Sequence, residues 1–466
     1  MQNEKLSILF LFLGLISCFS QNKQILYNFS EIPQSLLLNP ATEVKSKLFI
    51  GVPLLSGVHA HGGLSGFTVA DLFADDGVDF NEKLRSLIYS TASNDVVASN
   101  VQVDILSGGF KAKNPFKRIF YSFGIYQEAD FYMNWPRDLA ILAYDGNVTD
   151  KLYALSDLVL EAEVLTVYHF GFTEEISNKL TVGARAKIYS SAYNINSTRN
   201  QGTFLTTEGT NNIYSHKINA TLSLQSSGFP LVGRIDDDDL EYDPLKQIKK
   251  SIFLGGNLGV GFDVGFTYHS SDRLTYTGSI LDVGIITQSK EIQNFNFEGF
   301  YTFEGFEFLF PELVTDGELN DYWEDLKNEL EDMYSEDNKS YLTWRPIKIN
   351  GGMEYSFGKK KSEVCDCLLD EDTYMNLMGA HLYTVLRPKA PQMALTAFYS
   401  RKISDFLTTK VTYTIDKYSF NNIGLGVSFN YANFNFYMLA DNLLEYQNLS
   451  GANSLTVQFG FNFMMQ

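Results

Sequence analysis

The chain repeats one pattern of hydrophobic and polar positions many times. Its final segment alternates bulky apolar residues with small or polar ones. The apolar set is Leu455, Val457, Phe459, Phe461, Phe463 and Met465, and the polar set is Ser454, Thr456, Gln458, Gly460 and Asn462. Alternation with a period of two predicts β-strands with one apolar and one polar face. The same alternation recurs at 179–189, 257–269, 294–303, 406–416 and 421–431.

The length and number of these segments favour a barrel in a membrane. Strands of about ten residues, apolar on one face and separated by turns, are typical of transmembrane barrels. We count roughly 17 candidate strands, and single-chain bacterial barrels have even numbers, so at least one assignment fails. The sequence predicts an all-β fold, a transmembrane antiparallel β-barrel of about 14–16 strands with one or two short amphipathic helices. The alternative is a secreted soluble β-sandwich, whose polar face would also be wet.

Two segments replace the strand pattern with helical spacing. Residues 79–90 place apolar side chains from Phe80 to Ile88 on one face behind a capping Asp79. Residues 316–337 combine an apolar stripe with many acidic residues, and we expect this helix to dock on the barrel rim. The first helix either plugs the lumen or rests outside. A plugged lumen would favour gated transport, an empty lumen a pore, and a lumen filled by side chains a scaffold.

The first residues resemble a secretion signal. Lys5 precedes an apolar run, and Ser20 before Gln21 supplies a small residue for cleavage, which predicts a signal peptide over 1–20. The residues before Cys18 also resemble a lipoprotein box, so lipidation is the alternative. We expect residues 21–44 to form an N-terminal periplasmic segment. Residues 45–466 would form the barrel, with helical insertions near 79–90 and 316–337, in the outer membrane of a Gram-negative cell.

Charge and composition restrict the kinds of molecule that the protein is expected to bind. The formal net charge is −19 with only 20% charged residues, which argues against nucleic acid, because its binding needs clustered Lys and Arg. The expected partner is instead outer-membrane lipid. The polar strand faces carry charges that we expect to point into the lumen. These lumen-facing candidates are Arg185, Lys187, Asp263, Glu298 and Lys410.

Few residues suggest chemistry beyond this lining. His59 and His61 share one strand face, and Asp236 and Asp238 belong to a run of four aspartates. They are weak metal candidates, since no third histidine ligand can be placed and an acidic loop is usually solvated. No Gly-x-Ser-x-Gly stretch or catalytic triad is present. We therefore expect no enzymatic activity and no cofactor.

The C-terminal strand has a second feature. Gln458, Gly460, Phe463 and Met465 resemble the assembly signal at the end of outer-membrane barrels, although Gln466 rather than an aromatic residue ends the chain. This resemblance implies that the barrel assembly machinery is a partner.

The N-terminal region carries a family resemblance. Pro33-Gln34-Ser35-Leu36-Leu37-Leu38-Asn39-Pro40-Ala41, then Gly51-Val52-Pro53-Leu54 and residues 63–84, resemble a Bacteroidota outer-membrane β-barrel family of unknown function. The resemblance covers nearly the whole mature chain and implies an outer-membrane barrel without an assigned activity. Asn39-Pro40-Ala41 also resembles the barrel subunits associated with type IX secretion and gliding. The size is similar to that of long-chain fatty-acid transporter barrels.

Three functions remain open at this point. The first is a channel or carrier for small solutes. The second is a structural or accessory barrel of a secretion, gliding or envelope complex, with a periplasmic or envelope protein as partner. The third is a secreted soluble β-sandwich that binds a ligand.

Overall fold

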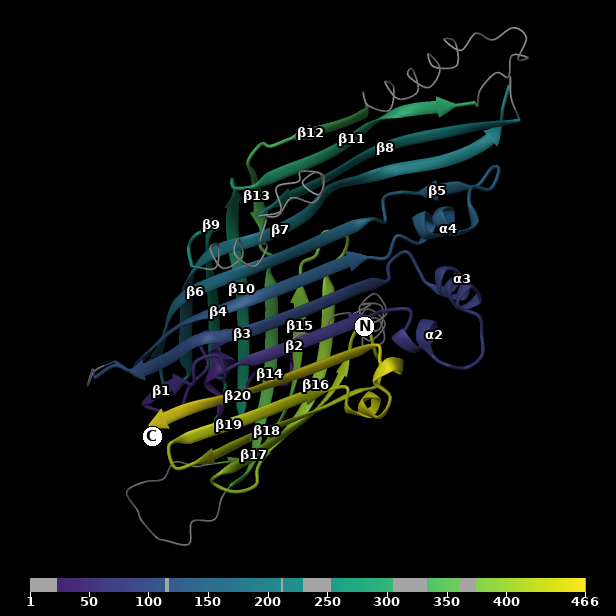
Figure 1. The fold of residues 1–466 in the computed structure, drawn as a ribbon. Helices are drawn as coiled ribbons and strands as arrows, with labels where there is room; N and C mark the ends of the chain where they lie inside the picture. Colours follow the sequence, from purple (N-terminus) through teal and green to yellow (C-terminus); the bar gives the residue numbers. More distant parts are fainter. Residues whose placement is uncertain are drawn as a thin grey trace, which may run out of the picture.

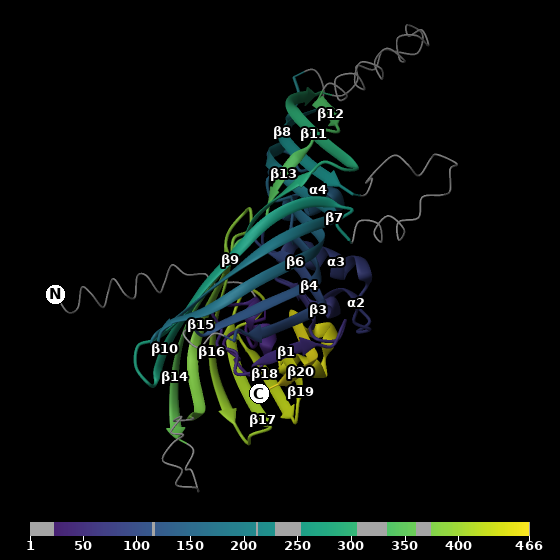
Figure 2. The same cartoon turned by 90° about the vertical axis from the view of Figure 1, so that its left-hand side faces the viewer.

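The chain folds into a closed antiparallel β-barrel (Figures 1 and 2). The computed structural model describes residues 23–113, 117–210, 213–228, 253–304, 333–359 and 374–465. The barrel wall has 14 strands, and the last one pairs with the first. The predicted antiparallel barrel of about 14–16 strands is confirmed. None of the described helices is both long and apolar enough to cross a membrane.

The wall strands follow one another around the barrel in chain order. The first wall strand is interrupted and consists of β1 (Leu48–Gly51) and β2 (Val58–Leu64), which both pair with the last strand. The others are β3 (Val96–Lys111), β4 (Ile119–Asn134), β6 (Val159–Ser177), β7 (Leu180–Glu208), β9 (Asn257–His269), β10 (Leu274–Gln288), β13 (Tyr341–Trp344) with β14 (Lys348–Lys359), β15 (Tyr374–Val385), β16 (Gln392–Lys402), β17 (Leu407–Ile415), β18 (Asn422–Tyr431), β19 (Phe434–Asp441) and β20 (Ser454–Met465).

The wall is apolar outside and polar inside. On β9, Val260 and Phe262 are 62% and 51% exposed, whereas Asp263 is completely buried. On β20, Phe461 is exposed and the polar Gln458 and Asn462 are buried. A soluble sandwich would bury the apolar row between its sheets. The observed faces are inverted, so the soluble β-sandwich is excluded.

The two ends of the barrel differ in their connections. At the end where β20 finishes, β6 joins β7 and β18 joins β19 through two-residue turns. The opposite end carries the long connections that contain α2 (Val69–Phe73), α3 (Phe80–Ser90) and α4 (Arg137–Asp145) (Figure 1). It also carries β5 (Leu152–Ala154) and the short helices η2 (Leu443–Gln447) and η3 (Leu449–Gly451). Asp79 caps α3 by accepting a hydrogen bond from the Asn81 amide.

A small sheet extends beyond the wall at the long-connection end. The distal half of β7 pairs with β8 (Tyr214–Ser227), which pairs with β11 (Ile292–Phe303), and β11 pairs with β12 (Tyr334–Asp337) (Figures 1 and 2). We call this sheet the extension. Most of the helix expected at 316–337 lies outside the described residues, and its last four residues form β12 instead.

The segment that fills the barrel is the N-terminal one. Residues 23–47, which we call the plug, lie inside the wall and include the 3-10 helix η1 (Pro33–Leu37) (Figure 1). The sequence predicts a periplasmic segment at 21–44, whereas the structure places this segment, from residue 23 onward, within the lumen. Helix α3, the other plug candidate, contacts α2 and α4 instead. The expected signal peptide at 1–20 lies outside the described residues.

Glycines on the inner face of the wall make room for the plug. A Cβ atom built on Gly183 would lie 2.1 Å from the Pro40 carbonyl oxygen, and one on Gly265 would lie 2.1 Å from Asn39 Oδ1. Real Cβ atoms do not approach oxygens so closely, so these positions admit only glycine while the plug is seated. The small residues of the polar strand faces therefore have a specific role, which is close backbone approach.

We predict that Gly183→Val loosens the plug without opening the wall. Overpacking of this kind costs about 1–3 kcal/mol, so a buried thiol at Ser35→Cys should react about fivefold or more faster with a maleimide. The background has Cys365 and Cys367 replaced by serine. The matched control is Gly62→Val, because nothing lies within 4 Å of a Cβ built there. Equal labelling rates in the two glycine variants would contradict the close fit.

Candidate functional site: the plugged lumen

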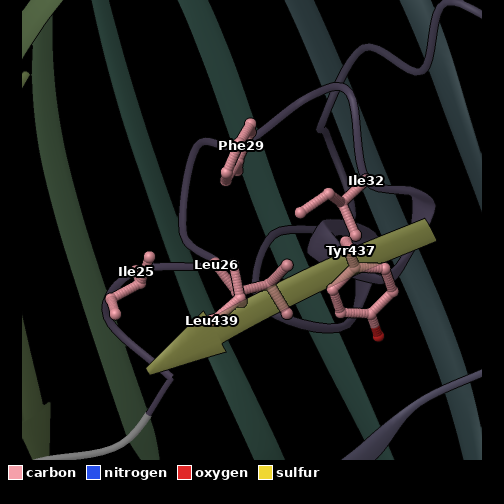
Figure 3. Close-up of a cluster of buried hydrophobic side chains, with 6 residues drawn as sticks. All are labelled: Ile25, Leu26, Phe29, Ile32, Tyr437 and Leu439. Carbon is pink, nitrogen blue, oxygen red and sulfur yellow. The ribbon is translucent and has the colours of Figure 1, made fainter. Parts of the chain in front are cut away.

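The plug begins with an apolar cluster against one strand of the wall. Ile25, Leu26, Phe29 and Ile32 of the plug pack with Tyr437 and Leu439 of β19 (Figure 3). All six side chains are at most 4% exposed. Burial of such side chains contributes roughly 1.5–3 kcal/mol each, so this cluster anchors the start of the plug.

The rest of the plug is held both by apolar contacts and by polar side chains of the wall, since Leu36 and Leu37 pack on further buried wall residues. Its backbone carbonyls accept hydrogen bonds from wall residues on several strands. The donors are Thr173 to Pro40 (2.6 Å), Thr267 to Ala41 (2.9 Å), Ser279 and Asn350 to Leu38 (2.6 and 3.4 Å), Arg185 to Leu36 and Leu37, and Lys410 to Tyr27 (2.5 Å). Gln34 and Asn462 exchange two amide hydrogen bonds of 2.8 and 3.0 Å. The plug thus contacts strands around the whole lumen.

Tyr27 is clamped from three sides. Its ring stacks on His381 with 3.9 Å between centroids, and its hydroxyl donates to Thr277 Oγ1 at 3.1 Å. The Lys410 ammonium binds the Tyr27 carbonyl and lies 4.2 Å from the centroid of the Phe398 ring. Burial raises the pKa of the Tyr27 phenol, so the hydroxyl stays protonated and remains a donor.

Glu43 fixes the other end of the plug. Its Oε1 atom accepts a hydrogen bond from Thr181 Oγ1 at 2.6 Å and lies 3.0 Å from His269 Nε2. Burial opposes ionisation of Glu43, but the hydrogen bonds with His269 and Thr181 outweigh it and lower the pKa of this carboxyl. Glu43 is therefore a carboxylate at neutral pH and ties the plug to β7 and β9.

Beyond the plug, ion pairs cross the lumen. We call the following residues the charge network: Arg185, Lys187, Asp263, Asp282, Lys348, Glu128, Arg345 and Glu163. Lys187 lies 2.9 Å from Asp263 and 2.5 Å from Asp282. Arg345, just after β13, reaches Glu128 on β4 at 2.8 Å and also pairs with Glu163 on β6. The network joins β4, β6, β7, β9, β10 and β14 into one layer.

A second cluster extends this layer toward the long connections. Arg387, after β15, pairs with Asp130 on β4 at 2.8 Å and with Glu161 on β6 at 3.2 Å. Its guanidinium also lies 5.0 Å from the centroid of the Tyr132 ring. Buried charges are costly unless paired, and these groups are paired within the wall itself. The layer therefore does not need the plug to satisfy most of its charges.

A cavity separates the plug from the charge network. Its empty space, together with the part that is open to solvent, is about 430 Å³, and we call it the lysine cavity. Its lining is Lys23, Leu37 and Leu38 of the plug with Gln102, Tyr126, Glu128, Lys187, Leu281, Asp282, Lys348 and Tyr383 of the wall. The cavity combines charged groups of both signs with apolar and aromatic surface.

Four of the five predicted lumen-facing residues lie inside the barrel. Arg185 and Asp263 form a buried pair at 2.9 Å, Lys187 joins them, and Lys410 binds the plug. Glu298 lies instead on β11 of the extension, because β11 pairs with β8 and β12 rather than with wall strands. There its side chain is 67% exposed and lies 3.4 Å from Arg199.

The metal candidates do not come together in the described part of the chain. His61 Nδ1 lies 3.0 Å from Thr456 Oγ1, and His59 is buried nearby on the same strand. Among the described residues no group of three or more histidine, cysteine or acidic side chains is arranged to hold a metal ion. Asp236 and Asp238 lie outside those residues.

The assembly-signal candidates occupy the last strand. Gln458 and Gly460 face the lumen side, and Phe463 and Met465 lie on the stretch of β20 that pairs with β1. A Cβ atom on Gly460 would lie 2.0 Å from the Ser56 carbonyl oxygen, so this glycine has a packing role in the folded barrel. Its part in assembly stays a prediction.

Several lumen residues were missed in the sequence. Glu128, Asp282, Arg345 and Lys348 form the centre of the charge network, and none was singled out. Glu128 and Asp282 do lie in strand segments, but Glu128 has a polar neighbour, Gln127, that blurs the alternation, and Asp282 sits at a bulge with φ +60°. Arg345 lies between strands, where alternation does not predict which way a side chain points. Isolated polar residues in otherwise apolar strands are the signal that could have found them.

We predict that Arg345→Met strongly destabilises the barrel. It leaves Glu163 without its buried counter-ion and Glu128 with Lys348 alone, and loss of one partner of a buried pair costs about 3–5 kcal/mol. The free energy of unfolding in urea, measured for protein folded into lipid vesicles, checks this. The matched control is Arg199→Met, whose pair with Glu298 is exposed and should contribute less than about 1 kcal/mol. Equal small losses in both variants would mean that the network is not a stabilising layer.

Comparisons with solved structures find barrels of similar architecture. A FadL homologue from Pseudomonas aeruginosa matches at 11% identity, with 97% of this chain and 100% of that chain covered and a TM-score of 0.44. The deltaS2S3 mutant of the monoaromatic hydrocarbon channel TodX matches at 10% identity, 92% and 94% coverage and a TM-score of 0.41. The toluene transporter TodX from Pseudomonas putida matches at 10% identity, 92% and 91% coverage and a TM-score of 0.35. At these identities and scores the likeness carries no argument about function.

The sequence comparisons give a family and no characterised relative. No curated protein matches the chain. The model of a family of unknown function, DUF5723, matches residues 40–441, which include all the wall strands from β1 to β19. The chain belongs to this family, DUF5723.

Proposed function

We propose that this protein is an outer-membrane barrel that moves small solutes through a lumen gated by its N-terminal plug. The exposed apolar row around the wall supports a location in lipid, because a closed barrel satisfies every ladder hydrogen bond without water. Outer-membrane barrels have short periplasmic turns and longer extracellular loops. By that rule the plug and the end of β20 belong to the periplasmic half, and the helices and extension face the outside.

One observation carries the proposal, namely that the lumen is filled by a separate terminal segment. In eight-stranded barrels the wall side chains alone fill the interior. A barrel of this size has a wider interior, which wall side chains alone do not fill. Here the filler is a separate chain segment, anchored by an apolar cluster at its start, by apolar contacts of Leu36 and Leu37 with the wall, and by hydrogen bonds to wall side chains. Each such bond contributes only about 0.5–1.5 kcal/mol net, since water replaces it when the plug leaves. The polar wall would remain solvated and folded.

The closed state has two layers, and both have to yield for passage. The plug blocks the half that contains the short turns, and the charge network spans the lumen beyond it. The network is built from paired side chains, which can separate in water at a moderate cost because each ion regains its hydration. A solute pathway lined this way is polar. The proposal assigns no catalytic role to any residue.

A second candidate function is an accessory barrel, and the extension is the observation that favours it. Ile213, just before β8, and Phe300 on β11 are 74% and 65% exposed, which suits a protein partner better than water. The resemblance to barrels of type IX secretion, gliding and Bacteroidota envelopes belongs to this candidate. With the orientation above, however, the extension lies outside the cell, so it would meet an extracellular or envelope partner rather than a periplasmic one.

We predict that removing or locking the plug changes conductance in opposite directions. Deletion of residues 23–44 should raise the single-channel conductance in planar bilayers by about tenfold or more, because the wall keeps its own polar lining. A disulfide between Gln34→Cys and Asn462→Cys should abolish any opening of the intact chain, and reduction should restore it.

The locking control joins two neighbouring wall strands instead of the plug. Thr396 and Thr414 face each other on β16 and β17 with their hydroxyls 2.9 Å apart, so a Thr396→Cys, Thr414→Cys disulfide should leave conductance unchanged. All variants use the background without Cys365 and Cys367. A plug-deleted barrel that is folded and still non-conducting would overturn the transport proposal and favour the accessory one.

A further inference from the structure

We infer that the lysine cavity is a binding site for a small solute carrying a carboxylate group, and that Lys23 of the plug recognises this anion. The cavity lies where plug and wall meet, so both contribute to its lining.

Lys23 is the cation of this cavity that lacks a counter-ion. Lys187 and Lys348 each pair with two carboxylates at 2.5–3.3 Å. Lys23 is buried too, yet among the described residues it forms no ion pair and donates only to the neutral Oε1 of Gln102. The amide of Gln102 in turn donates to Asp104 at 3.0 Å and so stands between the lysine and that carboxylate. A buried ammonium without a paired anion favours an anionic ligand.

His59 is a second buried group without a partner beside the same lysine. It is 1% exposed, and neither ring nitrogen has a hydrogen-bond partner in the described part of the chain. It occupies the sheet position next to Gln102 in the neighbouring strand, and Lys23 and Lys348 both act on it electrostatically. Buried polar atoms are normally satisfied, so an unpaired imidazole next to an unpaired ammonium indicates a missing polar ligand.

The remaining lining indicates the body of the ligand. Leu37, Leu38 and Leu281 supply apolar surface, and Tyr126 and Tyr383 supply aromatic rings. A carboxylate on a small apolar or aromatic body fits this mixture, whereas a larger sugar-like solute would leave its hydroxyls against leucine. Because Lys23, Leu37 and Leu38 belong to the plug, a bound ligand would bridge plug and wall.

The protonation of Lys23 makes a pH dependence part of the inference. The groups that act on its charge are Glu128, Lys348, Asp104, Asp282 and His59. Burial is the largest influence and lowers the pKa of Lys23 to about 8. The ammonium is therefore mostly charged at neutral pH and loses its proton as the pH rises through this value. Anion binding should weaken over the same range, and binding of the anion should take up a fraction of a proton.

Calorimetry on the purified full-length barrel in detergent tests the site. The probes are benzoate, its neutral isostere benzamide, and inorganic phosphate. We expect saturable binding of benzoate at pH 7, no binding of benzamide or phosphate, and benzoate affinity about tenfold or more weaker near pH 9.5. Lys23→Met should weaken benzoate binding by about tenfold or more, and Lys23→Arg, which keeps the charge, should restore most of it.

The matched control is Lys45→Met, on the same plug. Its side chain is 67% exposed and pairs with Glu31 at 2.7 Å, so benzoate binding should stay unchanged. Equal binding of benzoate and benzamide, binding of phosphate in place of benzoate, or unchanged affinity in Lys23→Met would overturn the inference. Failure of Lys23→Arg to bind better than Lys23→Met would do the same, provided that both remain folded by heat-dependent gel mobility.

The role of this ligand as the transported solute rests on the proposed function, whereas its binding does not. Benzoate binding that depends on Lys23, together with a non-conducting plug-deleted barrel, would keep the site and remove transport. Conductance without Lys23-dependent binding would keep transport and remove the site.

Discussion

Closure of the barrel is the constraint on which the rest of the structure depends. β20 pairs with β1 and β2, so the sheet has no free edge in the wall. Once the sheet is closed, alternate residues of every wall strand point either outward or into a lumen of fixed width. An apolar row outside then requires a polar row inside, and that row needs hydrogen-bond partners. The plug and the charge network are the two sources of those partners.

The two sources differ in how far they depend on one another. The charge network satisfies itself, since Lys187, Lys348 and Arg345 each contact two carboxylates of the wall. The plug instead offers backbone carbonyls to single wall donors such as Thr173, Thr267 and Ser279. Water can replace the hydrogen bonds between plug and wall more easily than it can replace the ion pairs of the charge network. The plug is therefore the part of the lumen that yields more easily, and the charge network is the part that yields less easily.

The fold was predictable because alternation fixes side-chain direction in a strand. The rows Val260–Phe262 and Phe461–Phe463 on one face, with Asp263 and Gln458 on the other, predicted two-faced strands, and the length and number of these strands favoured a membrane barrel over a sandwich. Alternation also placed Arg185, Lys187 and Lys410 in the lumen. It could not place Glu298, since the same pattern continues into the extension, where strands leave the wall. Pattern within one strand carries no information on which strand is its neighbour.

The plug was not predictable for a related reason. Residues 23–47 have neither strand nor helical periodicity, because their apolar groups pack on different parts of the wall, Leu26 on β19 and Leu36 on Phe120 of β4. Their resemblance to a family marked them as distinctive without placing them in the lumen. Arg345 and Arg387 lie between strands, and their partners on β4 and β6 are more than 180 residues away in the chain. Contacts between residues so far apart in the chain form only when the barrel closes. The sequence pattern predicts closure, but it does not predict which residues then face each other.

The inverted wall is the central claim, and two adjacent residues of β17 test it most directly. Val411 is 45% exposed on the outer face, and Thr412 is 1% exposed on the inner face. A nitroxide label on a cysteine at each position, with the protein in lipid vesicles, reports contact with lipid through its collision rate with oxygen. The account predicts a high oxygen and low nickel-chelate collision rate at position 411 and a low oxygen rate at position 412. Equal rates at both positions, or a water-exposed label at position 411, would contradict it.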